Sequence, residues 1–156
     1  MAIHARDTKI ETMHIVQPGD LNAANVLFGG RLMEWMDEAA ALSAMHYCQG
    51  HVVTGTVDSL VFYKGASQGD VIVICAQVTY KTKSTCEIRV RVHVQHVNGS
   101  LDLINKGYFV MVVVPDKAGK RPDIPELITD TQEERIEWEN GEIRNRIRKE
   151  RRQGGI

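Results

Sequence analysis

Three residue types that can act together on a carbonyl group lie close together in the sequence, between positions 18 and 40. Asn22 stands in a turn-rich stretch, and its side-chain amide offers both a hydrogen-bond donor and an acceptor. Gly29 and Gly30 come where a helix should begin, and the unpaired N–H groups of a helix start suit an oxyanion or a phosphate. Asp37 follows among apolar neighbours, where a carboxylate is costly unless it is paired or used.

Together these groups could hydrolyse an acyl compound. Asp37 can take a proton from water as a general base or attack as a nucleophile, and the sequence leaves both routes open. Asn22 can hold the water or the carbonyl oxygen, and the backbone N–H groups of Gly29 and Gly30 can stabilise an oxyanion. Each group also has a structural interpretation: an Asx turn at Asn22, tight packing at the glycines, and a carboxylate bonded to backbone or to a cation at Asp37.

Other hydrolytic chemistries lack their residue patterns. The histidines show no ligand spacing such as HxxxH, so we expect no metal site. The serines have no GxSxG frame, which argues against a serine hydrolase. The three cysteines, Cys48, Cys75 and Cys86, have no CxxC spacing, and their apolar surroundings favour reduced thiols packed in the core.

The composition is that of an ordinary globular chain. A length of 156 residues, with 43% hydrophobic and 25% charged residues, suits one domain with a substantial core. The net charge of −1 excludes a global basic field, so we expect no nucleic-acid partner. No apolar run reaches the ~18 residues of a membrane span, and the N-terminus has no signal-peptide pattern. We therefore expect no membrane partner and a cytoplasmic location.

One long helix and five strands must position the candidate groups. Apolar residues on almost every side of the segment from Phe28 to about Gln49 predict a helix wrapped by other structure, with Gly50 as its C-terminal cap. The four strands after the helix should have hairpin-like connections, which indicates an α+β fold with a mostly antiparallel sheet. The expected strands are Thr8–Val16, His51–Tyr63, Val71–Tyr80, Cys86–His96 and Lys106–Val114.

Two further features extend this arrangement. One sheet covers only one side of an apolar helix, so we expect a second copy of the chain to cover the other. The stretch Thr131–Arg152 predicts a C-terminal helix, because its Glu residues come mostly early and its Arg residues mostly late. Gly141 should weaken its middle, and Ile136, Ile143 and Ile147 give a sparse apolar stripe. We expect a solvated helix that docks loosely; the alternative is a helix that joins subunits or contacts a ligand's phosphates.

The segment from Asp20 to Gly30, followed by Trp35-Met36-Asp37, resembles the signature of hotdog-fold acyl-CoA thioesterases of the YciA-type and cytosolic acyl-CoA hydrolase family. One departure is Asn25, where the family has glycine; asparagine tolerates the left-handed backbone region better than other non-glycine residues. The resemblance implies a hotdog domain over residues 8–130, in which an antiparallel sheet wraps one long central helix. Residues 131–156 would form the charged helical tail.

The resemblance also implies a reaction and an assembly. The family hydrolyses acyl-CoA thioesters without a metal or organic cofactor, and its chains form homodimers, often gathered into trimers of dimers. Asn22 of one subunit should then face Asp37 of the other. A hotdog dehydratase of 3-hydroxyacyl thioesters is less consistent with the sequence, because the segment from Asn22 to Gly30 has no histidine. A non-catalytic acyl-CoA sensor is the other alternative.

Further residues are predicted to bind the coenzyme A part of such a substrate. The basic turn at 81–85 could clamp phosphates, although an ordinary hairpin turn explains it equally well. One strand should pass the helix start and line the pantetheine tunnel, with Asp58 as a candidate supporting carboxylate. Basic residues after the last strand, including Lys117, could reach the adenosine end. The predicted binding residues are Gly55, Thr56, Lys81, Lys83, Ser84, Thr85, Lys120 and Arg121.

Overall fold

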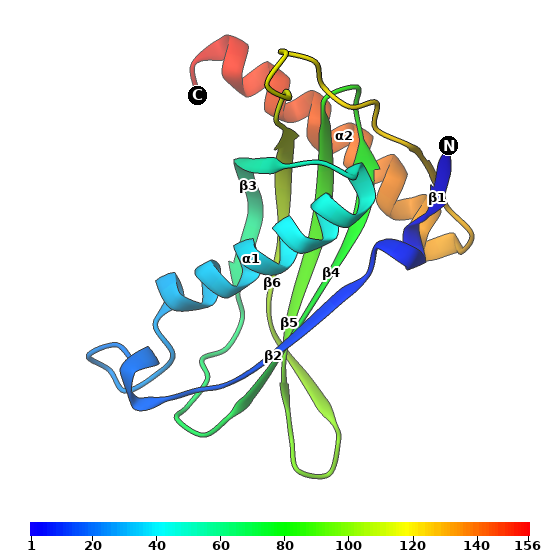
Figure 1. Cartoon of the computed structure of the whole chain (residues 1–156). Helices are drawn as coiled ribbons and strands as arrows, with labels where there is room; N and C mark the ends of the chain where they lie inside the picture. Colours follow the sequence, from blue (N-terminus) through cyan, green and yellow to red (C-terminus); the bar gives the residue numbers. More distant parts are fainter.

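The computed structural model describes all 156 residues and places two helices on opposite faces of one five-stranded sheet (Figure 1). In chain order the elements are β1 (Ala2–His4), β2 (Ile10–Ile15), α1 (Gly29–Cys48), β3 (Val52–Phe62), β4 (Val71–Lys81), β5 (Thr85–Gln95), β6 (Leu101–Val113), β7 (Glu126–Ile128) and α2 (Gln132–Gly154). The α+β class and the hotdog architecture expected from the sequence are confirmed. Neither α1 nor α2 combines the length and apolar character that a membrane-spanning helix requires.

The five-stranded sheet is antiparallel and has the strand order β2-β4-β5-β6-β3. The hairpins between β4 and β5 and between β5 and β6 form as the sequence predicts. However, β3 pairs with β6 at the sheet edge and not with β4, so a hairpin-like connection between β3 and β4 was a wrong prediction. The connecting segment instead passes the start of α1, where the Ala66 carbonyl accepts a hydrogen bond from the Leu27 N–H at 2.8 Å. At this contact the connection from β3 to β4 crosses from one side of the sheet to the other.

Apolar side chains between α1 and the inner face of the sheet form the core. Met36, near the middle of α1, is fully buried. The opposite side of the helix is not apolar, because Glu34, Glu38 and His46 are exposed there beside Leu42. The prediction of a helix that is apolar almost all round was therefore wrong. The same core contains Leu32, Trp35, Ala39, Ala40, Ala44 and Tyr47 of α1 and Ile74, Val78, Ile88, Val90, Val92, Phe109 and Met111 of the sheet.

The two ends of α1 depend on unusual backbone positions. Before the helix, Asn25 takes a left-handed conformation with φ of 61°, as the sequence comparison with the family predicted. At the other end the C-cap is Gln49, with φ of 52°, and not Gly50 as predicted. Gly50 instead lies in a tight place, because a Cβ atom there would lie 3.1 Å from Cγ of Pro122.

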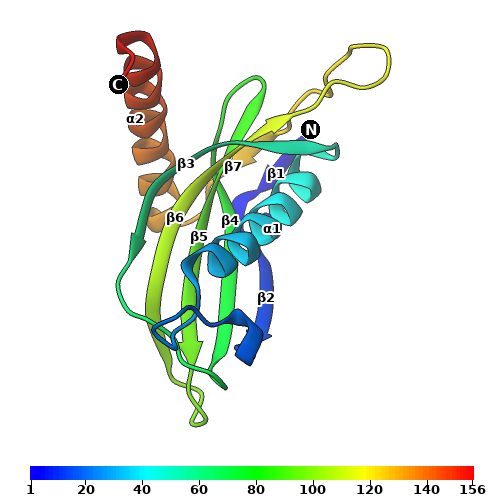
Figure 2. The ribbon, with the colours of Figure 1, turned by 90° about the vertical axis from the view of Figure 1, so that its left-hand side faces the viewer.

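Helix α2 lies on the outer face of the sheet, opposite α1 (Figure 2). Thr131 caps its start, where its hydroxyl accepts a hydrogen bond from the Glu134 N–H at 3.1 Å. Gly141 allows the helix to approach the sheet, because a Cβ atom there would lie 2.6 Å from Cβ of Tyr80. Trp138 packs beside the same Tyr80 ring, with the ring centroids 4.7 Å apart. The C-terminal helix is confirmed, but the expectation of loose docking was wrong.

A buried ionic network holds α2 in place. The carboxylate of Glu87, only 1% exposed, accepts two hydrogen bonds from Arg144, at 2.8 and 3.0 Å. Arg148 donates to Glu87 at 3.2 Å and to Asp58 at 3.0 Å. Tyr108 donates to the Glu137 carboxylate at 3.0 Å, and burial raises the pKa of this phenol. Charges that are taken out of water in this way need such partners, so the polar side of β5 serves as the docking face of α2.

The three cysteines are free thiols in two different surroundings. Cys48 and Cys86 are buried, with their sulfur atoms 3.6 Å apart between α1 and β5. Cys75 is only partly exposed on β4, and the partial burial of its thiol raises the pKa of that thiol. Packing of the thiols in the core is therefore confirmed for Cys48 and Cys86 but not for Cys75.

Candidate active site

Asp37 lies on the side of α1 that faces the edge strand β3. The Thr54 hydroxyl donates a hydrogen bond to Oδ1 of Asp37 at 2.5 Å, and it also contacts the Met111 sulfur at 3.6 Å. The second carboxylate oxygen, Oδ2, has no partner within the chain. The helix and the Thr54 contact therefore fix the carboxylate and leave one oxygen free to accept a proton.

Thr54 is the residue of this pair that sequence reasoning did not single out. It stands 17 positions after Asp37 and on a different element, so no local pattern links the two residues. The available signal was its place on a strand expected to pass the helix. The predicted candidates on that strand were instead its neighbours Gly55 and Thr56.

The start of α1 presents a group of free backbone donors. Phe28 is the N-cap residue, and its side chain makes no capping hydrogen bond. The first helical N–H with an acceptor in the backbone is that of Leu32, which donates to the Phe28 carbonyl at 3.1 Å. The N–H groups of Gly29, Gly30 and Arg31 therefore have no acceptor in the chain. Together with the positive end of the helix dipole, these N–H groups favour a negatively charged oxygen.

Asn22 forms the Asx turn that was one of the two interpretations of this residue from the sequence. Its Oδ1 atom accepts hydrogen bonds from the N–H groups of Ala24 at 2.9 Å and Val26 at 3.3 Å. Its Nδ2 atom has no partner within the chain. The turn thus uses the acceptor of this amide and leaves its donor available. The carboxylate of Asp20 stabilises the same loop, because it lies 3.3 Å from the Arg31 side chain at the helix start.

A cavity of about 360 Å³ brings Asn22 and the helix start together. Its lining is mainly apolar, with the ring of Phe62 packed close to Gly29. A Cβ atom on Gly29 would lie 3.4 Å from the Phe62 ring, which is an ordinary van der Waals distance. The other residues around the cavity are Val26, Leu27, Leu32, Tyr63, Lys64, Gly65, Ala66 and Ile104.

The predicted catalytic groups do not all meet within one chain. Gly29 and Gly30 are separated from Asp37 by two turns of the same straight helix. At about 1.5 Å per residue, this separation is roughly 10 to 12 Å along the helix axis. One thioester carbonyl group cannot contact both ends of such a distance. A single chain therefore holds two candidate half-sites, one at the helix start and one at the Asp37–Thr54 pair.

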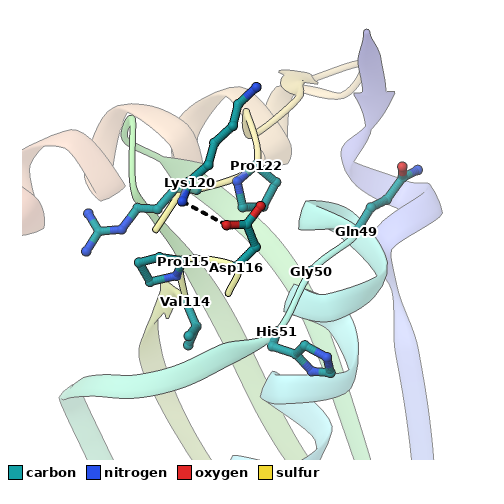
Figure 3. A pocket seen from close by; sticks show the side chains of 9 residues that line it. Gln49, Gly50, His51, Val114, Pro115, Asp116, Lys120 and Pro122 are labelled. Atoms are coloured by element: carbon teal, nitrogen blue, oxygen red, sulfur yellow. Dashed lines mark hydrogen bonds between the residues drawn. The ribbon is translucent and has the colours of Figure 1, made fainter. Parts of the chain in front are cut away.

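A second cavity, of about 410 Å³, lies at the other end of α1 (Figure 3). It contains two predicted binding residues, Lys120 and Arg121. Oδ1 of Asp116 accepts the N–H groups of Ala118 at 2.9 Å and Lys120 at 2.8 Å, which fixes this loop. Figure 3 shows the Lys120 side chain extending away from Asp116, so its ammonium group is not neutralised by that carboxylate.

The structure places Gly55, Thr56 and Thr85 on the outer side of the sheet. They line a cavity of about 100 Å³ beneath α2, together with Arg148 and Arg152. β3 passes the helix start as expected, but Phe62 lies there, whereas Gly55 and Thr56 lie nearer the beginning of the strand. Their role in substrate binding stays a prediction.

The turn between β4 and β5 is an ordinary hairpin, in which the Thr82 N–H donates to the Thr85 carbonyl at 2.9 Å. Nζ of Lys81 lies 3.3 Å from the Ile124 carbonyl and 3.2 Å from the Glu126 carboxylate. The Ser84 carbonyl accepts a hydrogen bond from the Val113 N–H at 3.0 Å. Lys83 is the exposed basic residue of the turn, and phosphate binding there stays a prediction. Asp58, considered as a carboxylate that supports the site, instead pairs with the arginines of α2.

The amino-acid sequence of this chain is similar to those of acyl-CoA thioester hydrolases. Residues 24–99 match the family model described as the thioesterase superfamily. The chain is 32% identical over 130 residues to the uncharacterized acyl-CoA thioester hydrolase YkhA of Bacillus subtilis, covering 83% of this chain and 75% of that protein. It is 31% identical over 147 residues to the cytosolic acyl coenzyme A thioester hydrolase of Homo sapiens, covering 91% of this chain but only 38% of the human protein.

Solved structures have a similar architecture. An acyl-CoA hydrolase from Staphylococcus aureus, in complex with butyryl coenzyme A, coenzyme A and coenzyme A disulfide, superposes with a TM-score of 0.91 at 30% identity, covering 99% of this chain and 94% of that one. A hexameric acyl-CoA thioesterase superposes with a TM-score of 0.89 at 31% identity and covers 96% of both chains. Variants of the S. aureus hydrolase with an asparagine, an aspartate or a threonine replaced by alanine have also been solved.

Proposed function

Because the chain belongs to the thioesterase superfamily, as a hotdog-fold acyl-CoA thioester hydrolase, we propose that it converts acyl-CoA and water to a carboxylic acid and coenzyme A at a site built from two chains. The observation that carries this proposal is the division of the catalytic groups along α1. The helix start offers oxyanion donors, and Asp37, roughly 10 Å away, offers the proton acceptor. A second copy of the chain would place its Asp37 near the helix start of the first chain, and its helix start near the Asp37 of the first chain.

The residue types replaced in the S. aureus hydrolase support this set of groups. The asparagine, aspartate and threonine replaced there follow one another at separations of 15 and 17 positions. Asn22, Asp37 and Thr54 have the same separations here. The likeness covers almost the whole of this chain, which supports treating the three residues as equivalent to Asn22, Asp37 and Thr54. We therefore include Thr54 in the proposed site as the residue that orients Asp37.

The edge strand β3 is the proposed contact between the two chains. It is 11 residues long, and its outer side has no strand partner. Val53, Val57 and Val61 are exposed along it. An exposed, apolar edge of this length invites another strand, and the β3 edge of a second copy satisfies both chains. Thr54 lies on this strand, so the pairing brings the second copy next to Asp37. The structure of a hexameric relative supports a homo-oligomer of this kind.

We assign Asp37 the role of general base. With Oδ1 held by Thr54, Oδ2 takes a proton from water while the water oxygen attacks the thioester carbonyl. Nδ2 of Asn22 and the N–H groups of Gly29 and Gly30, from the partner chain, stabilise the charge on the carbonyl oxygen. Collapse of this intermediate breaks the carbon–sulfur bond, and the proton passes from Asp37 to the coenzyme A sulfur. The proposed reaction needs no metal or organic cofactor.

Isotope labelling separates this route from nucleophilic attack by the carboxylate. In a single turnover in ¹⁸O-labelled water, a general base leads the label into the carboxylic acid product and not into the enzyme. A nucleophilic Asp37 would form a mixed anhydride, and attack of water on its aspartyl carbonyl would leave label in the Asp37 side chain. Mass spectrometry of the peptide that contains Asp37 detects this label. Label in that peptide would contradict the assignment.

We propose that the cavity at the end of α1 takes the phosphates of coenzyme A. His51, which lines this cavity, stands three residues before Thr54 on the chain that becomes β3. Three extended residues span about 10 Å, so the pantetheine arm can lead from the thioester toward this cavity. Lys120 and Arg121 supply positive charge there.

Replacement of Asp37 is the direct test of the proposed function. Asp37→Ala removes the base, so release of the coenzyme A thiol should fall by about 100-fold or more across a panel of acyl-CoAs. Glu38→Ala is the matched control, because Glu38 is the neighbouring exposed acid on the same helix. Full turnover by Asp37→Ala would exclude Asp37 from the mechanism. Binding of acyl-CoA without turnover by the wild type would instead favour the sensor.

A further inference from the structure

Helix α2 has an apolar face that the sheet does not cover. The face that docks on the sheet contains Gly141 and the residues of the ionic network. Beside it lie Ile136, Ile143 and Ile147, which are 46%, 43% and 38% exposed. Asn140, also exposed, completes this row. We call Ile136, Asn140, Ile143 and Ile147 the α2 seam.

The spacing of the α2 seam is typical of a helix that packs against another helix. Its members follow one another at intervals of four, three and four residues, which is the repeat of the core positions in a coiled coil. Three partly exposed isoleucines in one line are unexpected on a helix as polar as α2 unless a partner covers them. Asn140 is the one polar residue in this row.

The charges beside the α2 seam indicate which partner fits. The first half of α2 is rich in glutamate and the second half in arginine. Two residues on the outer flank of the seam, Glu139 and Arg146, are exposed and make no ion pair within the chain. They stand one heptad apart, at matching positions of the repeat. An identical helix lying antiparallel would place the Arg146 of one chain opposite the Glu139 of the other.

We propose that the α2 seam docks antiparallel against the α2 seam of a second copy of the chain. In this arrangement Ile136 of each chain packs on Ile147 of the other, and Asn140 lies beside Ile143 of the other. Two equivalent Glu139–Arg146 ion pairs close the contact along its outer flank. The helix is complementary to itself after a two-fold rotation, which is the requirement for an isologous interface.

This contact is separate from the strand contact proposed at β3, because α2 lies on the outer face of the sheet and β3 at its edge (Figure 2). A chain with two different isologous contacts joins two neighbours, and alternating contacts of this kind close into rings of even number. The β3 contact builds the dimer that carries the active sites. The α2 contact then joins dimers to one another, and it does not depend on the proposed catalytic roles.

Charge reversal tests the pairing. Glu139→Arg and Arg146→Glu should each place like charges opposite one another and separate the dimers, so the particle mass in sedimentation velocity should fall by about two- to threefold. The double variant, Glu139→Arg with Arg146→Glu, should restore the wild-type mass, because each chain again meets opposite charges. Lys149→Glu, an exposed change on another side of α2, should leave the mass unchanged.

The outcomes separate this contact from other interfaces. If both single variants keep the wild-type mass, the proposal is overturned. It is also overturned if the double variant stays dissociated while its circular dichroism and melting temperature match the wild type. Dissociation by Lys149→Glu to the same degree would show a general effect of charge and would likewise contradict the specific pairing. Thioesterase activity that survives in the separated dimers would leave the proposed function intact.

Discussion

The Asp37 carboxylate is oriented by a single hydroxyl group, that of Thr54, at 2.5 Å. A hydroxyl group orients a carboxylate without neutralising it, whereas a lysine or arginine at the same place would pair with the charge. The free oxygen of Asp37 therefore keeps its capacity to accept a proton. Asn22 is similar in this respect: its Oδ1 atom accepts the hydrogen bonds of the turn, and its Nδ2 donor stays free.

Thr54→Val should test this orientation with little change in shape. A hydrogen bond to a charged group contributes about 1.5 to 3 kcal/mol, so we expect kcat to fall roughly 10- to 100-fold. KM should change little, because Thr54 is not placed to hold the coenzyme A part of the substrate. Steady-state kinetics with one acyl-CoA measure both constants. Thr54→Ser, which keeps the hydroxyl group, is the control, and an equal loss in both variants would argue against a specific role for the Thr54 hydroxyl.

At the scale of single residues, the sequence predicts which residues belong to the candidate site better than it predicts which side chains contact one another. Asn22, Asp37 and the glycine pair could be chosen because their chemistry and spacing are visible along the chain. The left-handed backbone at Asn25 could also be predicted, since few side chains tolerate it. The contact between Thr54 and Asp37 could not, because it depends on where an edge strand crosses a helix. Gly50 was misread for a similar reason: the helix cap is Gln49, and Gly50 lies in the tight space beside Pro122.

At the scale of elements, α2 is the part of the fold that differs most from expectation. A charged helix is ordinarily solvated, and its sequence does not reveal that Glu87 lies on a distant strand beneath it. The docking uses matched charges in place of a large apolar face, with Gly141 allowing the close approach to Tyr80. The helix α1 and the strand β5 were predictable because the sequence signals for both are local.

Glu87→Gln should show how much α2 depends on this network. The change leaves Arg144 and Arg148 buried without their shared negative partner, so the free energy of unfolding should fall by about 3 kcal/mol or more. Urea denaturation measures it. Glu150→Gln, an exposed glutamate on the same helix, should change the stability by less than about 0.5 kcal/mol. Similar values for the two variants would mean that the network contributes little.

At the scale of the whole molecule, the proposed active site belongs to a pair of chains. The edge position of β3 could not be predicted from the sequence, because strand order depends on the crossing of the segment that follows β3. Once β3 lies at the edge, its exposed valines and the half-sites on α1 indicate the same partner. The need for a second copy was expected from the sequence, although the helix proved less apolar than that argument assumed.

Mixed dimers test the shared site. Asn22→Ala and Asp37→Ala chains should each be nearly inactive alone, because each lacks one half of every site. Co-expression should restore about one quarter of the wild-type activity, since half of randomly formed dimers are mixed and each of these contains one intact site of two. Thiol release by the purified mixture measures the recovery. Failure of stable mixed dimers to recover activity would place both residues in the same site of one chain.

The position of the oxyanion donors and Asp37 on one stiff helix also has a kinetic consequence. A lone chain carries the two halves of the catalyst held permanently apart, so no fluctuation of a folded monomer can assemble them. In dilute solution the catalyst is therefore the product of an encounter between two chains. Its velocity should then grow with the square of the protein concentration and become proportional to it only when pairing is complete.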